Sequence, residues 1–200
     1  MKKWLVPLLI IVGLIVLIGV WFANVNNRLV GLDETASAQW GNVESAYQRR
    51  ADLIPNIVNT AKGYAQFEQE TLTQVIEARS KATAVTIDPT NITPEQLDQF
   101  QEVQGGLSSA LARLLAVFER YPDLKANENF KELINELERT ENRINVERNR
   151  FNEAVRPYNT ALREFPTSLA AGILGFDAKA YFEAQEGTEN APDVEFDFSS

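Results

Sequence analysis

Residues 4–23 read WLVPLLIIVGLIVLIGVWFA, an unbroken apolar run that constrains how the rest of the chain can fold. The run carries no charged side chain, and a bilayer core of about 30 Å requires about 20 such residues in a helix. A cleaved signal peptide has a shorter apolar stretch and small residues before the cut. A cut after Ala23 would instead place Trp21 at the third position before it. We therefore predict an uncleaved transmembrane anchor over residues 4–23, preceded by a short head of residues 1–3.

The charges that flank this run predict its orientation. Lys2 and Lys3 precede it together with the α-amino group, whereas Arg28 alone follows it closely. Positively charged flanks stay in the cytoplasm. We therefore expect a single-pass membrane protein whose soluble domain is extracytoplasmic.

Composition excludes several classes of function. The formal net charge of −9 would repel nucleic acid and an anionic lipid surface. The chain contains no Cys and no His, so disulfides, imidazole metal ligands and His-dependent catalytic pairs are all excluded. We accordingly expect no cofactor, no metal site, no catalytic residues and no enzymatic activity.

A seven-residue periodicity predicts a long helix near the C-terminal end. The recurring apolar positions are Phe130, Leu137, Ile144, Phe151, Tyr158 and Phe165, with Ile134, Val155 and Leu162 as companions. A sustained pattern of this kind indicates a helix that packs on other helices at a shallow angle. Pro157 should bend this helix near its end without stopping it.

Upstream sequences predict further helices. Thr93-Pro94-Glu95-Gln96 has the form of a capping box and should begin a helix that Pro122 ends. Two earlier helical stretches, Leu29–Tyr47 and Ile57–Ala84, are expected to join around Pro55. The first of them should continue directly from the anchor, because residues 24–27 contain no Pro or Gly.

These patterns predict an all-α protein in which the N-terminal transmembrane helix leads into a long antiparallel up-and-down bundle of three to four helices. We assign the bundle to residues 24–182. Residues 183–200 are acidic, contain no Lys or Arg, and are expected to form a flexible tail.

Polar residues on the predicted core stripes form one candidate site. Glu141 and Arg148 lie one heptad apart on the Ile134/Val155 stripe, so each should need an oppositely charged partner from another helix. The candidate network, which binds a small anion or fixes helix register, is Arg49, Arg50, Asp52, Asn56, Glu141, Arg148 and Asn152.

The tail offers a second candidate contact. Val194, Phe196 and Phe198 alternate with acidic residues as in a short strand. Such a segment is either disordered, packed on the bundle, or added to the edge of a partner's sheet.

Several motifs resemble those of the bacterial LemA family. The run from Arg49 to Val58, followed by Gly63-Tyr64, is similar to the family signature. Further matches are Glu77-Ala78-Arg79, the run from Tyr121 to Phe130, Glu141-Asn142-Arg143-Ile144, Arg148, Asn152, Tyr158-Asn159, Phe165-Pro166 and the closing Pro192, Val194 and Phe196. The chain departs from the family at Phe67-Glu68, where His-Glu is common, so any role of that His cannot apply here.

The resemblance implies a single-span protein of the bacterial inner membrane with an antiparallel helical bundle. Relatives are linked to a membrane metalloprotease of the HtpX type and to magnetosome membrane formation, which implies an accessory role. We therefore expect a membrane-anchored, non-catalytic adaptor or scaffold that presents a helical face and its tail to an envelope partner. The alternative is a sensor or ligand-binding bundle that holds a small anion in the Arg/Glu network. Homo-oligomerisation is left open.

Overall fold

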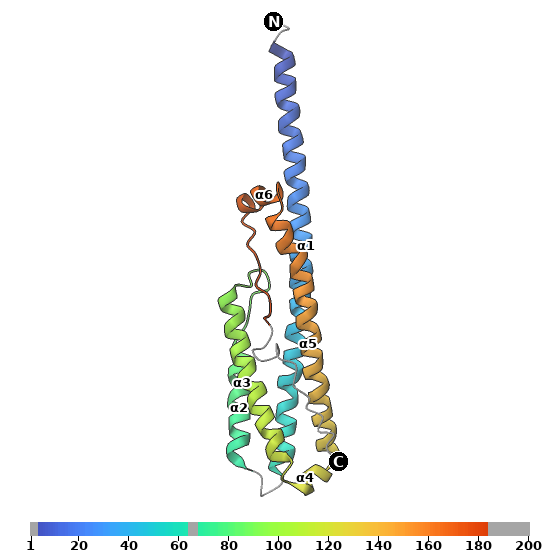
Figure 1. Cartoon of the computed structure of the whole chain (residues 1–200), viewed down its shortest axis with the longest axis vertical. Helices are drawn as coiled ribbons and strands as arrows, with labels where there is room; N and C mark the ends of the chain where they lie inside the picture. The colour runs from blue at the N-terminus through green and yellow to red at the C-terminus, as the bar shows by residue number, and fades with distance from the viewer. Residues whose placement is uncertain (1–3, 64–67, 184–200) are drawn as a thin grey trace, which may run out of the picture.

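Six helices make up the part of the chain that the computed structural model describes, which is residues 4–63 and 68–183. In chain order they are α1 (Leu5–Lys62), α2 (Gln69–Ala84), α3 (Pro94–Phe118), α4 (Pro122–Ala126), α5 (Glu128–Arg163) and α6 (Thr167–Leu174). They form a long, narrow molecule from which the N-terminal end of α1 projects (Figure 1). The described residues contain no strand, and the predicted all-α class is confirmed.

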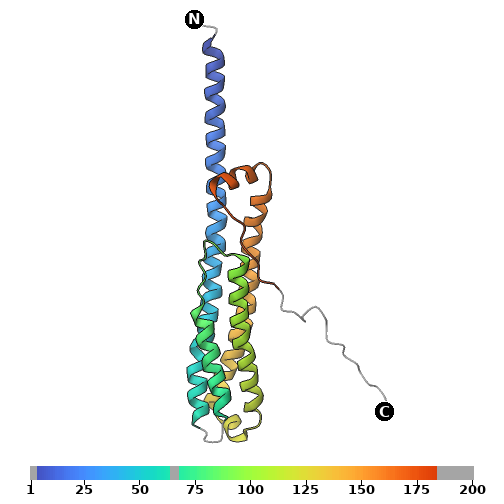
Figure 2. The same cartoon turned by 90° about the vertical axis from the view of Figure 1, so that its left-hand side faces the viewer.

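Helix α1 passes from the apolar run into the bundle without interruption, as predicted, over 58 residues. At 1.5 Å per residue its length is about 87 Å. The large apolar side chains from Leu8 to Val20 are between 49% and 69% exposed, so this part of α1 is not the core helix of a soluble domain. Within the described chain, α1 alone is long and apolar enough to cross a bilayer, which indicates a membrane anchor (Figure 2).

The helix break predicted at Pro55 is wrong, because α1 continues through this residue to Lys62. Proline has no backbone N–H, so the carbonyl of Ala51 loses its usual helical partner. Arg79 of α2 replaces that partner, since its Nε donates to the Ala51 carbonyl oxygen at 2.7 Å. The stretch predicted as one helix over Ile57–Ala84 is therefore divided between the end of α1 and α2.

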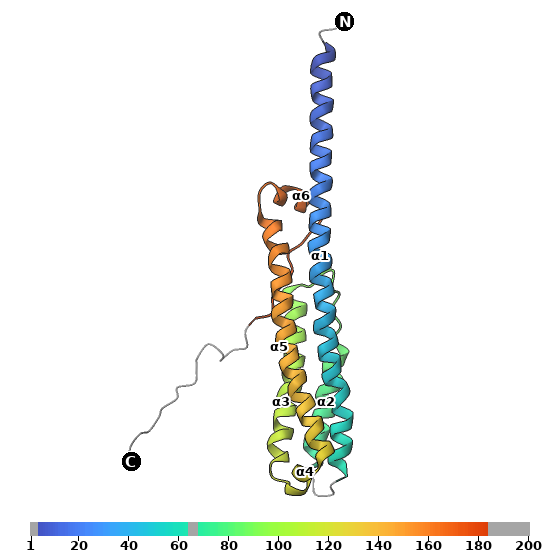
Figure 3. The ribbon, with the colours of Figure 1, turned by 90° about the vertical axis from the view of Figure 1, so that its right-hand side faces the viewer.

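Helix α5 lies beside α1 along the length of the bundle (Figure 3). Its predicted seven-residue stripe is buried at Phe130, Leu137, Ile144, Phe151 and Tyr158. Pro157 lies inside the helix, as predicted. The prediction that Phe165 is the last buried member of the stripe is wrong, because Phe165 lies beyond the end of α5 and is 81% exposed.

Helices α2 and α3 pack on each other and cover only the half of the α1–α5 pair that is distant from the apolar run (Figures 1 and 3). The capping box predicted for α3 is present, with Thr93 Oγ1 accepting from Gln96 N and Gln96 Oε1 accepting from Thr93 N. The bundle therefore has four helices in its distal half and two in its membrane-proximal half.

An extended segment and α6 complete the membrane-proximal half. Helix α6 ends at Gly175, whose positive φ of 75° is a conformation that favours glycine. Residues 176–183, here called the strap, then run back along the bundle between the α1–α5 pair and the beginning of α3 (Figure 1). Phe182 of the strap stacks on Trp40 of α1 with ring centroids 5.8 Å apart, so the strap is part of the core.

The Arg79 bond predicts a specific double-mutant result. Arg79→Met should destabilise the fold by about 1–3 kcal/mol, because it leaves the buried carbonyl of Ala51 without a donor. The same substitution should cost clearly less in a Pro55→Ala background, where residue 55 regains an N–H for that carbonyl. Urea unfolding of the four proteins in detergent micelles, followed by circular dichroism, measures the coupling. Equal losses in both backgrounds would contradict this role of Arg79.

Candidate functional site

The predicted polar residues separate into a buried group and an exposed group. Successive residues on a helix point about 100° apart, and Arg50 therefore faces inward whereas Arg49 faces solvent. Arg50 is 1% exposed, while the Arg49 side chain is 67% exposed and donates from its Nε to Glu136 Oε1 at 3.0 Å. The exposed group does not join the predicted network: Asp52 accepts from Gln48 on its own helix, and Asn56 lies at the surface.

Arg50 joins α1 to α3 and α5 through its guanidinium group and reaches α2 through Gln104. Its Nη1 donates to Ser108 Oγ of α3 at 2.7 Å and to Glu141 Oε1 of α5 at 2.8 Å. Its Nη2 donates to Gln104 Oε1 at 2.6 Å, and Gln104 Nε2 in turn donates to the carbonyl of Ala82 in α2 at 3.1 Å. A planar guanidinium suits such a junction because its donors diverge at fixed angles.

Arg148 and Asn152 contact the strap. Arg148 Nη2 donates to Gln101 Oε1 of α3 at 3.1 Å and to the Glu183 carbonyl at 2.9 Å, and its guanidinium lies 4.8 Å from the centre of the Phe182 ring. Asn152 Nδ2 donates to the Phe182 carbonyl at 2.8 Å and Asn152 Oδ1 accepts from Phe182 N at 2.9 Å. Arg148 and Asn152 thus hold the strap, whereas Arg50 pairs with Glu141; Arg50, Glu141 and Arg148 nevertheless line one cavity.

Sequence reasoning named Asn159 only as part of a family motif and gave it no role in the candidate site, although it holds the strap in the same way as Asn152. Asn159 Nδ2 donates to the Lys179 carbonyl at 2.8 Å, and Asn159 Oδ1 accepts from Lys179 N at 3.0 Å. Asn152 and Asn159 are seven residues apart, so they lie on one stripe of α5. Together they form with the strap the backbone hydrogen bonds that a neighbouring strand would otherwise provide. Their seven-residue spacing was the feature of the sequence that could have predicted this shared role.

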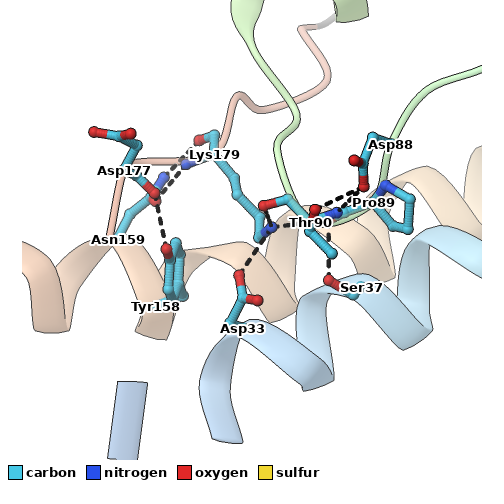
Figure 4. A network of polar contacts seen from close by, with 9 residues as sticks. All are labelled: Asp33, Ser37, Asp88, Pro89, Thr90, Tyr158, Asn159, Asp177 and Lys179. Atoms are coloured by element: carbon cyan, nitrogen blue, oxygen red, sulfur yellow. Dashed lines mark hydrogen bonds and ion pairs between the residues drawn. The ribbon is translucent and has the colours of Figure 1, made fainter. Parts of the chain in front are cut away.

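Lys179 was also missed, although it closes the membrane-proximal half of the bundle (Figure 4). Its Nζ donates to the carbonyls of Pro89 and Thr90 at 2.8 and 2.9 Å and lies 2.9 Å from Asp33 Oδ1 of α1. The loop between α2 and α3 is thereby joined to α1 and to the strap. The Lys179 side chain is 2% exposed, so these partners replace the water contacts that its ammonium group loses on burial.

Tyr158 lies beside this cluster and donates from its hydroxyl to the Asp177 carbonyl at 2.8 Å. Burial raises the pKa of Tyr158 to about 12, with smaller contributions from the carboxylates of Asp33 and Asp177. The hydroxyl therefore stays protonated and acts as a hydrogen-bond donor that fixes the strap to α5.

Glu147 of α5 is a third buried charge that sequence reasoning missed, and its side chain is 1% exposed. Its carboxylate accepts from Gln39 Nε2 at 2.8 Å and pairs with Arg143 at 2.6 Å and Arg150 at 3.1 Å. Desolvation pushes the pKa of Glu147 upward, but the Gln39 hydrogen bond and the two arginine charges outweigh it, and the pKa is lowered. The carboxylate is therefore ionised and links α5 to α1.

A cavity of about 610 Å³ lies beside Arg50, between α1, α3, α5 and the end of the strap. The residues that line it include two arginines, Arg50 and Arg148, and four acidic residues, Asp98, Glu102, Glu141 and Glu183. Both Nη atoms of Arg50 already donate to protein acceptors. Because acidic residues outnumber arginines around the cavity, the binding of a small anion there is disfavoured. In the described part of the chain, no group of three carboxylates is placed to hold a metal ion.

The predicted tail contacts Val194, Phe196 and Phe198 lie outside the described residues.

Comparisons with known proteins agree with the sequence resemblance. The LemA family model matches residues 39–196. Protein LemA of Metamycoplasma hominis is 30% identical over 103 residues, which cover 51% of this chain and 43% of that protein. Magnetosome protein MamQ 2 of Paramagnetospirillum magneticum is 28% identical over 174 residues, which cover 78% of this chain and 64% of the relative. Magnetosome protein MamQ of Magnetospirillum gryphiswaldense is 27% identical over 173 residues, with the same coverage of 78% and 64%. The match thus spans less than two thirds of each relative's length.

Two neighbouring arginines provide a matched test of the buried junction. Arg50→Met should destabilise the protein by about 1–3 kcal/mol, because it leaves Gln104 and Ser108 without the guanidinium that donates to them, whereas Glu141, 36% exposed, can be solvated by water. Arg49→Met should cost only about 0–1 kcal/mol, because the Arg49–Glu136 pair is exposed to solvent on its arginine side. Urea unfolding of full-length variants in detergent micelles measures both values. Losses of the same size would show that Arg50 is no more important to the fold than a surface arginine.

Proposed function

The chain belongs to the LemA family, and on that premise we propose that it is a membrane-anchored, non-catalytic adaptor that holds a rigid helical bundle and its C-terminal tail at a fixed position relative to the bilayer. The observation that carries this proposal is the unbroken helix α1, which contains both the apolar run and the longest helix of the bundle. A rigid connection of this kind suits a protein that presents a surface. A flexible linker would serve a domain that acts independently of the membrane.

The use of the polar groups supports a role without catalysis. Arg50, Glu147 and Lys179 are each buried, and each is paired with groups from other helices or loops of the same chain. Arg50 lines the cavity of about 610 Å³, but both of its Nη atoms already donate to protein acceptors, whereas catalytic groups in a cleft have unpaired or strongly perturbed side chains. The buried charges of this protein act on its own structure.

The strap determines where the tail begins. Glu183 is joined through its carbonyl to Arg148 of α5, near Gln101 of α3, so the residues that follow start from the side of the bundle. Residues 184–200 carry the predicted contacts Val194, Phe196 and Phe198 among acidic residues. We propose that this segment, together with a face of the bundle, engages a membrane or envelope protein, for which an HtpX-type metalloprotease is a candidate through family resemblance alone.

Orientation belongs to the same proposal. Lys2 and Lys3 on the short side of the apolar run favour an extracytoplasmic bundle in the inner membrane of a bacterium. Partners would then be proteins of the envelope or the extracytoplasmic parts of membrane proteins.

Cross-linking in intact spheroplasts tests both the adaptor role and the orientation. A membrane-impermeant, lysine-reactive cross-linker should reach the exposed Lys62, Lys81, Lys125 and Lys131 of the bundle. We expect a reproducible adduct with one membrane or envelope protein. A chain ending at Glu183 should lose most of this adduct, because it lacks the tail. A variant with a four-residue Gly-Ser insertion after Ala23 should lose it too, because the insertion interrupts the rigid connection between the membrane segment and the bundle.

The controls separate the possible failures. Residues 1–23 fused to an unrelated helical domain should give no adduct. An adduct that forms only after cell lysis would show that the bundle is cytoplasmic, and it would still support the adaptor role. No adduct above the fusion control in either condition would contradict the adaptor role.

A further inference from the structure

Helix α6 has one face packed on the bundle and one that is uncovered. Its buried residues, Thr167, Ala170 and Ala171, belong to or adjoin the membrane-proximal core cluster, which includes Val25 and Leu29 of α1. The opposite face carries Leu169 and Ile173, which are 62% and 77% exposed. Phe165, just before the helix, is 81% exposed. Leu169 and Ile173, four residues apart on α6, thus form one uncovered apolar stripe, and the exposed Phe165 lies in the turn that precedes the helix.

This stripe lies at the depth where α1 is expected to leave the bilayer. Trp21 and Phe22, at the end of the apolar run, pack against the same cluster as α6. Val25 and Leu29 follow Ala23 by two and six residues, which places them about 3–9 Å beyond the apolar run along the helix axis. The headgroup region on each side of a bilayer is about 5–8 Å thick. A helix packed on Val25 and Leu29 therefore lies at about the level of that region.

The placement of α6 fits a helix lying in the plane of the membrane surface. It runs across the end of the α1–α5 pair at an angle to α1, at the end of the bundle from which the apolar run projects (Figures 1 and 2). Its eight residues, TSLAAGIL, contain no charged side chain. The nearest carboxylates in sequence, Glu164 and Asp177, both lie outside the helix, and Glu164 is paired with Arg28 at 3.6 Å.

From these observations we propose that α6 is a second membrane contact, in which Phe165, Leu169 and Ile173 insert into the interface of the lipid leaflet that faces the bundle. Short helices with an apolar face lie in the interface in this way, with the apolar side chains at the boundary of the acyl region. A transmembrane helix alone fixes the height of the bundle but leaves it free to tilt and to rotate about α1. A second contact beside it would restrict both motions. The proposal rests on the anchoring of residues 4–23 and is independent of any partner.

The absence of Cys in the chain allows a direct depth measurement. Single cysteines at Leu169 and Ile173 would carry a nitroxide spin label in the full-length protein reconstituted into phosphatidylcholine vesicles. Collisions with oxygen, which concentrates in the acyl region, and with a water-soluble nickel chelate would be compared at each site. The matched control is Val146→Cys, since Val146 is an apolar residue on the side of the bundle that is 45% exposed. Leu14→Cys, within the apolar run, tests the anchor itself.

We expect the oxygen-to-nickel accessibility ratio at positions 169 and 173 to exceed that at position 146 several-fold and to lie below that at position 14. A ratio at 169 and 173 equal to that at 146 would overturn the proposal. Low accessibility to both reagents would also overturn it, because it would mean that protein covers the stripe. A water-like ratio at position 14 would instead show that the anchor has failed, and the proposed membrane contact of α6 would fail with it.

Discussion

The continuity of α1 is the constraint on which the rest of the structure depends. Helix α5 packs along it, α2 packs on its distal part, and α6 packs on the first turns after the apolar run. A helix of this length keeps its direction only if every turn remains hydrogen-bonded, and Pro55 removes one such bond. The bond from Arg79 to the Ala51 carbonyl restores the lost partner from outside the helix. Two sequence motifs that are far apart in the chain, around Pro55 and Arg79, therefore serve one structural purpose.

Buried charges fix how the other elements sit on α1. Each of the three acts at a different level of the bundle: Arg50 joins α1 to α3 and α5, Glu147 joins α5 to α1, and Lys179 joins the strap and the α2–α3 loop to α1. Apolar contacts alone would allow one helix to slide along another by a turn with little change in buried area. A buried charge removes that freedom, because a shifted register would leave it unpaired. The polar groups thus specify one arrangement of a repetitive core.

Local signals and long periodicities could be predicted from the sequence. The capping box at Thr93 needs only four adjacent residues, and the stripe from Phe130 to Tyr158 repeats often enough to define a helix. The break at Pro55 was predicted wrongly because its compensation comes from Arg79, which no local pattern connects to it. The predicted polar network included exposed residues because adjacent residues such as Arg49 and Arg50 face different sides of a helix, and only packing decides which of them is buried. The strap was missed because asparagine side chains, rather than a neighbouring strand, satisfy its backbone.

Amide hydrogen exchange of the full chain in lipid nanodiscs tests most directly whether the membrane segment and the bundle share one rigid helix. Residues 24–30 form the junction, and in a continuous helix their amides remain bonded to carbonyls four residues earlier. We predict protection across these residues comparable to that of residues 36–47, within the same helix. Exchange as fast as that of the loop around Asp88 would show that α1 opens at the junction, and would contradict the account.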